Sequence, residues 1–290
     1  MTFPIAAALL MATGLRMSAE EKVIYEKPSR FNMIVVTESD NGTRTLWFQK
    51  NGARQSVVRP GDPDYLELPY ARAMLSSLAF CEKSARVLIV GVGGGTLPSF
   101  LHKHYPAMHI DAVDIDPDVV DVAKKLFGLA EDALLRVHVA DGRRFIEEVK
   151  DPYDIIMLDA YGPDSIPAHL ATVEFLRAAR KALAPGGIVA GNLWSRYTNP
   201  LYDAMVRTYQ EAFEELHVVE ARGSGNHILI GPQQKIGSSV EDIIRRATQV
   251  SKDGSFGFDM GQVIKDGHRY VGEKEPSAEV LTDKTESLPR

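Results

Sequence analysis

The sequence predicts an α/β protein in which a small antiparallel β domain precedes a doubly wound sheet. Three observations carry this prediction. Residues 23–58 contain short β-branched runs separated by Asn-Gly turns, as in a set of hairpins. From residue 86 onward, apolar runs of strand length alternate with amphipathic helical stretches. The last two apolar runs, 216–220 and 226–230, lie too close together for a crossover helix, so we expect a final antiparallel hairpin.

The composition is that of a globular protein. Of 290 residues, 44% are hydrophobic and 25% are charged, which excludes collagen-like, coiled-coil and wholly disordered chains. The net charge is −6, from 33 Lys and Arg against 39 Asp and Glu, and no dense basic stripe offsets it. We therefore expect neither nucleic acid nor an anionic membrane as the partner, whereas a cationic ligand would meet a favourable field. The single cysteine, Cys81, excludes a disulfide framework and is expected to be a small buried hydrophobe.

Four regions are expected along the chain. They are a leader over 1–20, an N-terminal β-hairpin domain with a linking helix over 21–80, a Rossmann-like nucleotide-binding catalytic domain over 81–272, and a polar tail over 273–290. Because the tail has a hydrophobic interruption only at Val280 and Leu281, we expect it to pack loosely.

The leader assignment depends on residues 2–15, an uncharged and mostly apolar run. This run is too short to span a bilayer and is similar to the apolar part of a signal peptide. No Lys or Arg precedes it, so a start at Met17 or a short packing helix are alternatives. We expect a cytoplasmic protein without a membrane span and keep periplasmic export through this run as the alternative.

The N-terminal sheet follows from four strand-like runs: 23–25, 31–37, 45–49 and 55–58. The turn 39–42 reads Ser-Asp-Asn-Gly, and its Asn-Gly pair favours a tight hairpin. A second Asn-Gly pair, at 51–52, separates the third run from the fourth. Prolines then interrupt the chain, and residues 70–80 are predicted to form the linking helix.

The catalytic domain is predicted as five strands with helices between them. The strands are 87–90, 110–115, 135–139, 155–158 and 188–193, and the helices are 97–104, one starting at Pro117, 143–149, 168–183, 201–213 and 240–250. The first strand is apolar without alternation, as in a strand buried on both faces. Pro117 occupies a favoured first-turn position, and a Pro-Gly-Gly sequence ends the long helix 168–183.

A glycine-rich loop, GVGGGT at 91–96, directly follows the first buried strand and opens a helix. Glycines allow the backbone to turn sharply there and to approach a ligand at the carboxyl edge of the sheet. Dinucleotide sites usually have a further glycine where Thr96 stands, so the pattern favours an S-adenosyl nucleotide over NAD. We assign Gly91, Gly93 and Gly95 to nucleotide binding.

Three acids follow the next two strands. Asp114 lies 114 − 91 = 23 positions after the first glycine, where an acid can hold the two ribose hydroxyls. Asp116 directly precedes Pro117 and is expected to cap the helix that starts there. Asp141 and Gly142 follow the third strand. A lone Asp141 would merely cap the next helix, but beside the glycine loop and Asp114 we assign this pair to nucleotide binding, with the carboxylate near the adenine.

Asp159 ends the fourth strand, at the edge that faces the ligand crevice. A carboxylate there can bind an ammonium group or take a proton from an attacking amine, and the structural alternative is an Asx-turn before Gly162. Tyr161 and Asp164 add an aromatic ring and a second acid to the same loop. Carboxylates beside apolar walls suit a polyamine, so Asp159 is the predicted catalytic residue and Tyr161 and Asp164 are predicted to bind substrate.

These residues and their order resemble the spermidine/spermine synthase family of polyamine aminopropyltransferases, especially its bacterial spermidine synthase-like branch. Three further segments carry the resemblance. Ser-Arg-Phe-Asn at 29–32 resembles the family's Ser-x-Tyr-Gln, Asn-Gly-Ala-Arg-Gln at 51–55 resembles its Asp-Gly-x-x-Gln, and Leu-Thr-Asp at 281–283 resembles a C-terminal motif of the branch. Tyr70 resembles the tyrosine of a Tyr-His-Glu segment. The resemblance implies nucleotide binding by Asn32 and substrate binding by Gln55 and Tyr70.

The resemblance also implies a class I S-adenosylmethionine-methyltransferase-like fold with a final antiparallel hairpin. The implied donor is decarboxylated S-adenosylmethionine, with ordinary S-adenosylmethionine as the alternative, and the implied acceptor is a small amine such as putrescine. The amine, deprotonated with help from Asp159, would displace methylthioadenosine. No metal is needed, and none is expected, because the sequence lacks His-Glu-x-x-His and Cys-x-x-Cys motifs. A homodimer stays open.

Three departures affect the amine end. The family has an aspartate where Gly94 stands, a second aspartate where Gly162 stands, and His-Glu in place of Ala71 and Arg72. We expect Gly94→Asp to place a carboxylate against that of ordinary S-adenosylmethionine. The rivals are a class I methyltransferase on a small acceptor, favoured by Gly94, and a non-catalytic nucleotide or polyamine sensor. An NAD-dependent oxidoreductase is disfavoured by Thr96.

Overall fold

The computed structural model describes residues 21–50, 52–162, 166–272, 274 and 278–285. The expected leader, Asp164 and part of the polar tail lie outside this range. The strands are β1 Lys22–Pro28, β2 Met33–Glu38, β3 Arg44–Trp47, β4 Arg54–Val58, β5 Arg86–Val90, β6 His109–Asp114, β7 Leu135–Val139, β8 Tyr153–Leu158, β9 Leu183–Trp194, β10 His217–Ala221, β11 Asn226–Pro232 and β12 His268–Tyr270. The helices are α1 Pro69–Ser76, η1 Ser77–Phe80, α2 Thr96–His104, α3 Pro117–Leu126, α4 Gly142–Glu147, η2 Ala168–Leu170, α5 Val173–Lys181, α6 Tyr202–Ala212, α7 Val240–Asp253 and α8 Met260–Gly267.

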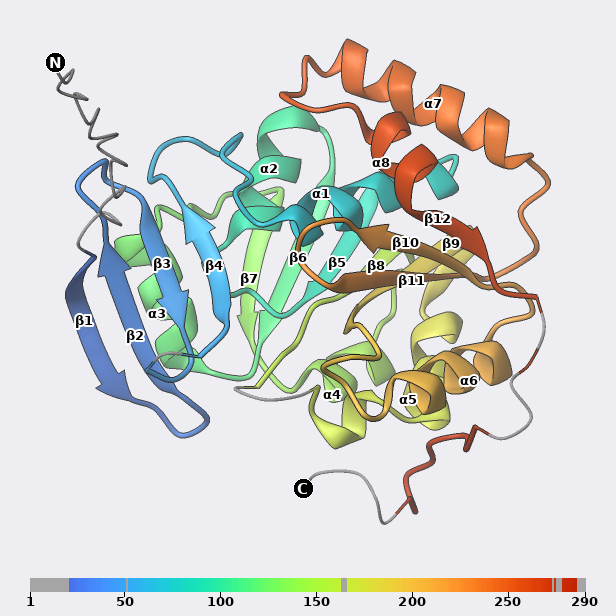
Figure 1. The fold of residues 1–290 in the computed structure, drawn as a ribbon, viewed down its shortest axis with the longest axis horizontal. Coiled ribbons are helices and arrows are strands. Elements are labelled where there is room, and N and C mark those ends of the chain that lie inside the picture. The colour runs from blue at the N-terminus through green and yellow to red at the C-terminus, as the bar shows by residue number, and fades with distance from the viewer. Residues whose placement is uncertain (1–20, 51, 163–165, 273, 275–277, 286–290) are drawn as a thin grey trace, which may run out of the picture.

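The first four strands form a separate antiparallel sheet with the order β1-β2-β3-β4, at the left in Figure 1. One of its faces packs on α3 through an apolar cluster of Ile34, Val36, Leu46, Phe48, Val119, Val122 and Phe127. On the β4 edge, the Gly94 N–H donates to Ser56 Oγ over 2.8 Å. The small sheet is therefore attached to the glycine loop and can form a wall over it.

The large sheet has the order β12-β10-β11-β9-β8-β5-β6-β7 (Figure 1). Strands β9 to β7 in that order run parallel, whereas β11, β10 and β12 pair antiparallel. This confirms the doubly wound, class I methyltransferase-like fold with a closing antiparallel hairpin. The strand order reverses between β5 and β8, so the ligand crevice is expected outside their carboxyl ends.

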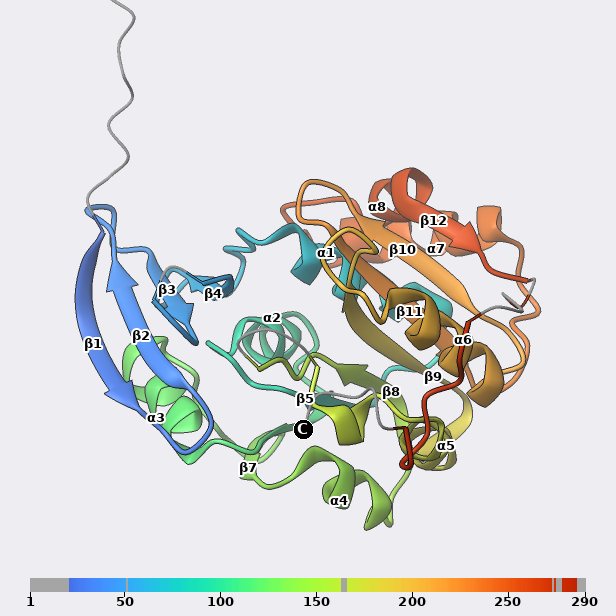
Figure 2. The ribbon, with the colours of Figure 1, turned by 60° about the horizontal axis from the view of Figure 1, so that its bottom comes forward.

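Helices cover both faces of the large sheet (Figure 2). Alternate residues of β5 serve the two sides: Val87 and Ile89 pack with α1, α2, α7 and α8, and Leu88 and Val90 pack with α4, α5 and α6. This strand is buried on both faces, as its unbroken apolar run predicted. In the described residues, no helix has the length and hydropathy needed to cross a membrane.

Two expectations about the elements are wrong. The helix predicted over 168–183 is interrupted, because the Thr172 side chain accepts a hydrogen bond from the Phe175 N–H and starts α5 as an N-cap. The preceding turn is a separate 3-10 helix, η2. The tail does not pack loosely at Leu281, whose side chain is fully buried. Cys81 is buried and free, as predicted.

Candidate active site

A cavity of about 720 Å³ opens at the carboxyl ends of the parallel strands, between the large sheet and the small one. This volume is in the range of small-molecule sites. The cavity is lined by ten of the predicted site residues: Asn32, Gln55, Tyr70, Gly91, Gly93, Asp114, Asp141, Gly142, Asp159 and Tyr161. Gly95 does not line the cavity. It is the N-cap of α2 with a φ of 77°, and a Cβ there would lie 3.1 Å from the Leu129 side chain. The loop that carries Asp164 lies outside the described residues.

The glycine loop is held against the strand that carries Asp159. At Gly91 the φ is 101°, and a Cβ there would lie 2.3 Å from the Asp159 carbonyl oxygen. The Gly91 N–H donates to the Val113 carbonyl, and the Asp159 N–H donates to the Val90 carbonyl. Only glycine fits this position. The loop, Asp114 and Asp159 therefore share one rigid edge of the sheet.

Asp114 fixes the same loop. Its carboxylate accepts hydrogen bonds from the backbone N–H groups of Val92 and Asp116, each over 2.9 Å. Burial raises the pKa of Asp114, and these backbone donors oppose that shift. A carboxylate has more than two acceptor positions, so Asp114 can hold the loop and still accept from ribose hydroxyls.

Asp116 caps α3 by accepting from the Asp118 N–H over 3.0 Å, as predicted. It also accepts from Ser29 Oγ over 2.5 Å and from Asn32 Nδ2 over 3.4 Å. The Asn32 Oδ1 atom is buried, and within the described structure it has no hydrogen-bond partner. Because Asn32 lines the cavity, this oxygen can accept a hydrogen bond from a bound ligand.

Asp141 caps the next helix and also lines the cavity, the two positions that the sequence left open. Its side chain accepts from the Arg144 N–H over 3.0 Å and caps α4. Its other oxygen lies 2.9 Å from His169 Nε2, and both residues line the cavity. The adjacent Gly142 must lack a side chain, because a Cβ would lie 2.4 Å from Val90 Cγ1.

The expectation for Gly94→Asp is wrong. Residue 94 does not line the cavity. A Cβ there would lie 2.9 Å from Ser56 Cβ and 3.1 Å from Phe127 Cδ1. An aspartate at this position would therefore press on the small sheet and on the end of α3 instead of facing a donor's carboxylate.

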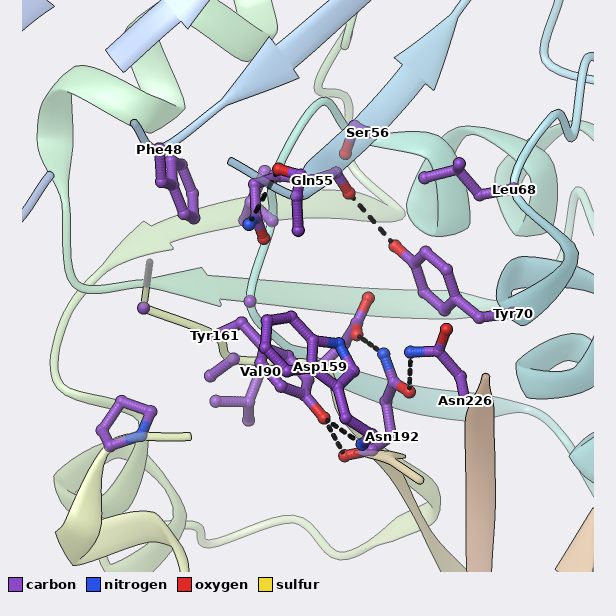
Figure 3. Close-up of a pocket in the computed structure, with 18 of the residues that line it drawn as sticks. Phe48, Gln55, Ser56, Leu68, Tyr70, Val90, Asp159, Tyr161, Asn192 and Asn226 are labelled. Carbon is purple, nitrogen blue, oxygen red and sulfur yellow. Dashed lines mark hydrogen bonds between the residues drawn. The ribbon is translucent and has the colours of Figure 1, made fainter. Parts of the chain in front are cut away.

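Asp159 is a half-buried carboxyl with few hydrogen-bond donors. Asn192 Nδ2 donates to its Oδ1 over 2.8 Å, and Asn226 Nδ2 donates to Asn192 Oδ1 over 3.0 Å (Figure 3). Burial raises the pKa of Asp159 to about 7, while hydrogen bonds from Asn192 and Tyr70 act in the opposite direction. Near neutral pH this group can both accept and release a proton.

Aromatic side chains surround this carboxyl. Tyr161 Oη donates to the Asn192 carbonyl over 3.0 Å and accepts from the Trp194 N–H over 3.1 Å, so its hydroxyl is engaged by β9. Its ring stacks on Trp194 with the centroids 5.2 Å apart. The single Tyr70 hydroxyl proton has two acceptors within reach, the Gln55 carbonyl at 3.5 Å (Figure 3) and the Asp159 carboxylate. Tyr161 therefore offers the cavity a ring face and not a free hydroxyl.

Sequence reasoning missed several residues that line the cavity, among them His169, Asn192, Trp194 and Asn226. Asn192, within the apolar strand β9, and Asn226, at the start of β11, are polar residues at 5% and 6% exposure. A polar residue inside such a run was the available signal. In the described ranges, no group of three or more His, Cys, Asp or Glu is arranged to hold a metal ion.

Comparison with known proteins identifies the family of this chain. The model of the spermine/spermidine synthase domain matches residues 68–218. A polyamine aminopropyltransferase of Vibrio vulnificus is 35% identical over 217 residues, which cover 73% of this chain and 72% of that protein. A probable spermidine synthase from Corynebacterium glutamicum shares the fold, with a TM-score of 0.68 and 21% identity over 92% of this chain and 98% of that one.

Human methyltransferase-like protein 13, solved in complex with SAH, is also similar, with a TM-score of 0.60 and 30% identity over 68% of this chain and 98% of that one. The family model and the Vibrio relative confirm the resemblance that the motifs indicated. This chain belongs to the spermine/spermidine synthase family of transferases.

Proposed function

We propose that this protein is a polyamine aminopropyltransferase, which moves an aminopropyl group from decarboxylated S-adenosylmethionine to an amine such as putrescine. The observation that carries the proposal is the position of Asp159, a half-buried carboxyl whose pKa burial raises to about 7, beside the glycine loop in one cavity. The Vibrio relative is named for this activity.

The chemistry is a displacement at carbon. Asp159 takes a proton from the acceptor's ammonium group, and the neutral nitrogen attacks the propyl carbon bonded to the donor's sulfonium. The carbon–sulfur bond breaks, its electron pair stays on sulfur, and neutral methylthioadenosine leaves. A buried carboxyl with a raised pKa is a stronger base than an exposed one, which favours the proton transfer. The ring faces of Tyr161 and Trp194 give the acceptor's methylenes an apolar wall.

The donor's nucleoside fits the other end of the cavity. In this proposal Asp114 accepts from the ribose hydroxyls and Asp141 from the adenine amino group; both acids line the cavity, as do Gly91 and Gly93. Asn32 Oδ1 supplies a further buried acceptor. The cavity is also large enough to hold a nucleoside and a small amine together.

The second candidate is methyl transfer from ordinary S-adenosylmethionine. It is favoured by the likeness to a human methyltransferase solved with SAH. In both reactions an amine attacks a carbon bound to sulfonium, so Asp159 has the same role. The two candidates differ in the group that is transferred to the acceptor, aminopropyl or methyl, and therefore in the nucleoside that is released.

A product assay separates them. Purified protein is incubated with putrescine or spermidine and either donor, and the nucleosides are identified by mass spectrometry. Release of methylthioadenosine from the decarboxylated donor supports the proposal. If that donor is not consumed while S-adenosylmethionine yields a methylated amine, the methyltransferase is correct. If neither nucleotide binds in calorimetry, both candidates are wrong. A homodimer and a cytoplasmic location stay predictions, to be checked by light scattering and fractionation.

A further inference from the structure

Residues 280–285 are built into the body of the protein next to the cavity. Leu281 is fully buried between two helices. Its N–H donates to Thr208 Oγ1 of α6 over 2.9 Å, and its carbonyl accepts from the Val173 N–H of α5 over 2.8 Å. Both backbone groups are thus satisfied by helices of one face of the sheet. The burial and the two hydrogen bonds of Leu281 fix the position of Asp283, two residues later.

Asp283 is the centre of a polar cluster. Its two oxygens accept from Arg143 Nη1 and Nη2, each over 2.7 Å, and Oδ1 also accepts from Thr172 Oγ1 over 2.7 Å. The Arg143 guanidinium is 21% exposed and lowers the pKa of the Asp283 carboxyl below its usual value. A forked pair of this kind fixes direction as well as distance. Asp283 therefore ties α4 to the N-cap of α5.

The cluster continues to the cavity wall. Arg143 directly follows Gly142, which lines the cavity, and its Nη1 lies 3.4 Å from the His169 carbonyl oxygen as a donor. His169 in turn contacts Asp141 over 2.9 Å, and both line the cavity. Arg143 thus holds two separate wall segments, 141–142 and 169–170, through one guanidinium that Asp283 orients.

We propose that Asp283 is a positioning residue for the nucleoside end of the cavity: through Arg143 it fixes the wall of Asp141 and His169 and so sets the preference for an adenine-type base. This rests on the proposed function, in which Asp141 accepts from the adenine amino group. His169 and the α4 cap fix the direction of the Asp141 carboxylate. A base with a carbonyl oxygen in place of the amino group would meet an acceptor and be rejected.

The test is calorimetry of methylthioadenosine and methylthioinosine, which differ in that amino group. Wild type should prefer methylthioadenosine. Asp283→Asn keeps the shape but loses the charge, and should weaken methylthioadenosine about three- to tenfold and methylthioinosine less, so that the preference narrows. The kcat at saturating donor should stay within about twofold, because Asp159 is not touched. Asp121→Asn, which removes the exposed ion pair with Lys125 on α3, is the matched control and should change nothing.

A double-mutant cycle identifies the route. If Asp283 acts through Arg143, the double variant Arg143→Lys with Asp283→Asn should be no weaker than the worse single variant. Arg143→Lys alone keeps the positive charge but loses the two-pronged hydrogen bond to Asp283. It therefore tests the role of Arg143 even if the Asp283→Asn variant is unstable. An unchanged affinity ratio in both single variants, with wild type still binding methylthioadenosine, overturns the positioning role alone. If wild type binds neither nucleoside, the proposed function fails and this role fails with it.

Discussion

The two ends of the cavity are built in different ways. The centre of the nucleoside end is made from consecutive strand ends, and its contacts are local: Asp114 accepts from the N–H groups of Val92 and Asp116, while Asn32 and His169 add to it from farther along the chain. The acceptor end takes one side chain from each of several distant elements, namely Tyr70 of α1, Asp159 next to β8, Asn192 of β9 and Asn226 of β11 (Figure 3). A local site follows from sequence order, whereas the acceptor end exists only once strand pairing has brought its parts together.

The ends also differ in how they treat charge. Burial raises the pKa of Asp114, but backbone N–H donors oppose that shift and favour its charged form, which suits the binding of hydroxyl groups. Asp159 is likewise half-buried, but its donor is a side chain, the Asn192 amide, and burial raises its pKa to about 7. The same residue type therefore binds at one end and titrates at the other. The predictions below test whether this division is real.

The largest effect is expected at the titrating end. Asp159→Asn removes the base but keeps the shape and a hydrogen-bonding group. We expect kcat to fall about 10²- to 10⁴-fold, with nucleotide affinity changed less than about twofold. Turnover at saturating substrates and calorimetry with methylthioadenosine measure the two quantities. A variant with more than a tenth of wild-type kcat would show that Asp159 is not the base.

The converse result is expected for Asp114. Asp114→Asn replaces one acceptor oxygen with a donor, so a charge-assisted contact to the ribose is lost. This should weaken methylthioadenosine by about tenfold or more, equivalent to roughly 1.5–3 kcal/mol, with kcat at saturating donor much less affected. Because Asp114 also holds the glycine loop, circular dichroism is used to check that the variant is still folded. Affinity within about twofold of wild type would remove Asp114 from the nucleoside site.

The contrast between the two ends also explains what could be read from the sequence. The glycine loop and Asp114 follow a buried strand directly, so their place at the sheet edge was predictable. Asn192 and Asn226 come together because β9 and β11 pair antiparallel, with Asn226 opposite Trp194, and no spacing along the chain specifies that register. His169 was hidden in a predicted helix, because the Thr172 cap was not recognised. The buried position of Leu281 depends on α5 and α6, two helices that are distant from it in the sequence.

A smaller effect is expected on stability. The Asp159 pKa is about 7 in the folded protein and near 3.8 in a solvated chain, so between about pH 4 and 7 the folded state binds more protons than the unfolded one. Stability therefore falls as pH rises through that window, because the buried carboxyl becomes charged. Asp159→Asn has no carboxyl to ionise and so does not lose stability in this way. Its Tm should be a few degrees above that of wild type at pH 8 and close to that of wild type at pH 4.5. A Tm difference that does not grow with pH would contradict the raised pKa.

The smallest effect is expected at Asn226, which does not touch Asp159. Its Nδ2 group donates to Asn192 Oδ1, and this contact orients the Asn192 amide so that its own NH₂ faces the Asp159 carboxyl. In Asn226→Ala the Asn192 oxygen is left buried without this donor, and the amide gains from rotating away. Asp159 then loses a donor that stabilises its charged form, so its pKa should rise further.

The measurable consequence is a displaced pH profile. The midpoint of kcat against pH should move up from about 7 by roughly half to one unit, which corresponds to a net hydrogen bond of about 1 kcal/mol. At pH 7 the rate should drop a few-fold and recover at pH 9, because the base is still present. Thr198→Ala, which alters another cavity-lining residue, is the control and should leave the midpoint in place. A rate that falls equally at every pH would mean that Asn226 shapes the cavity without orienting Asn192.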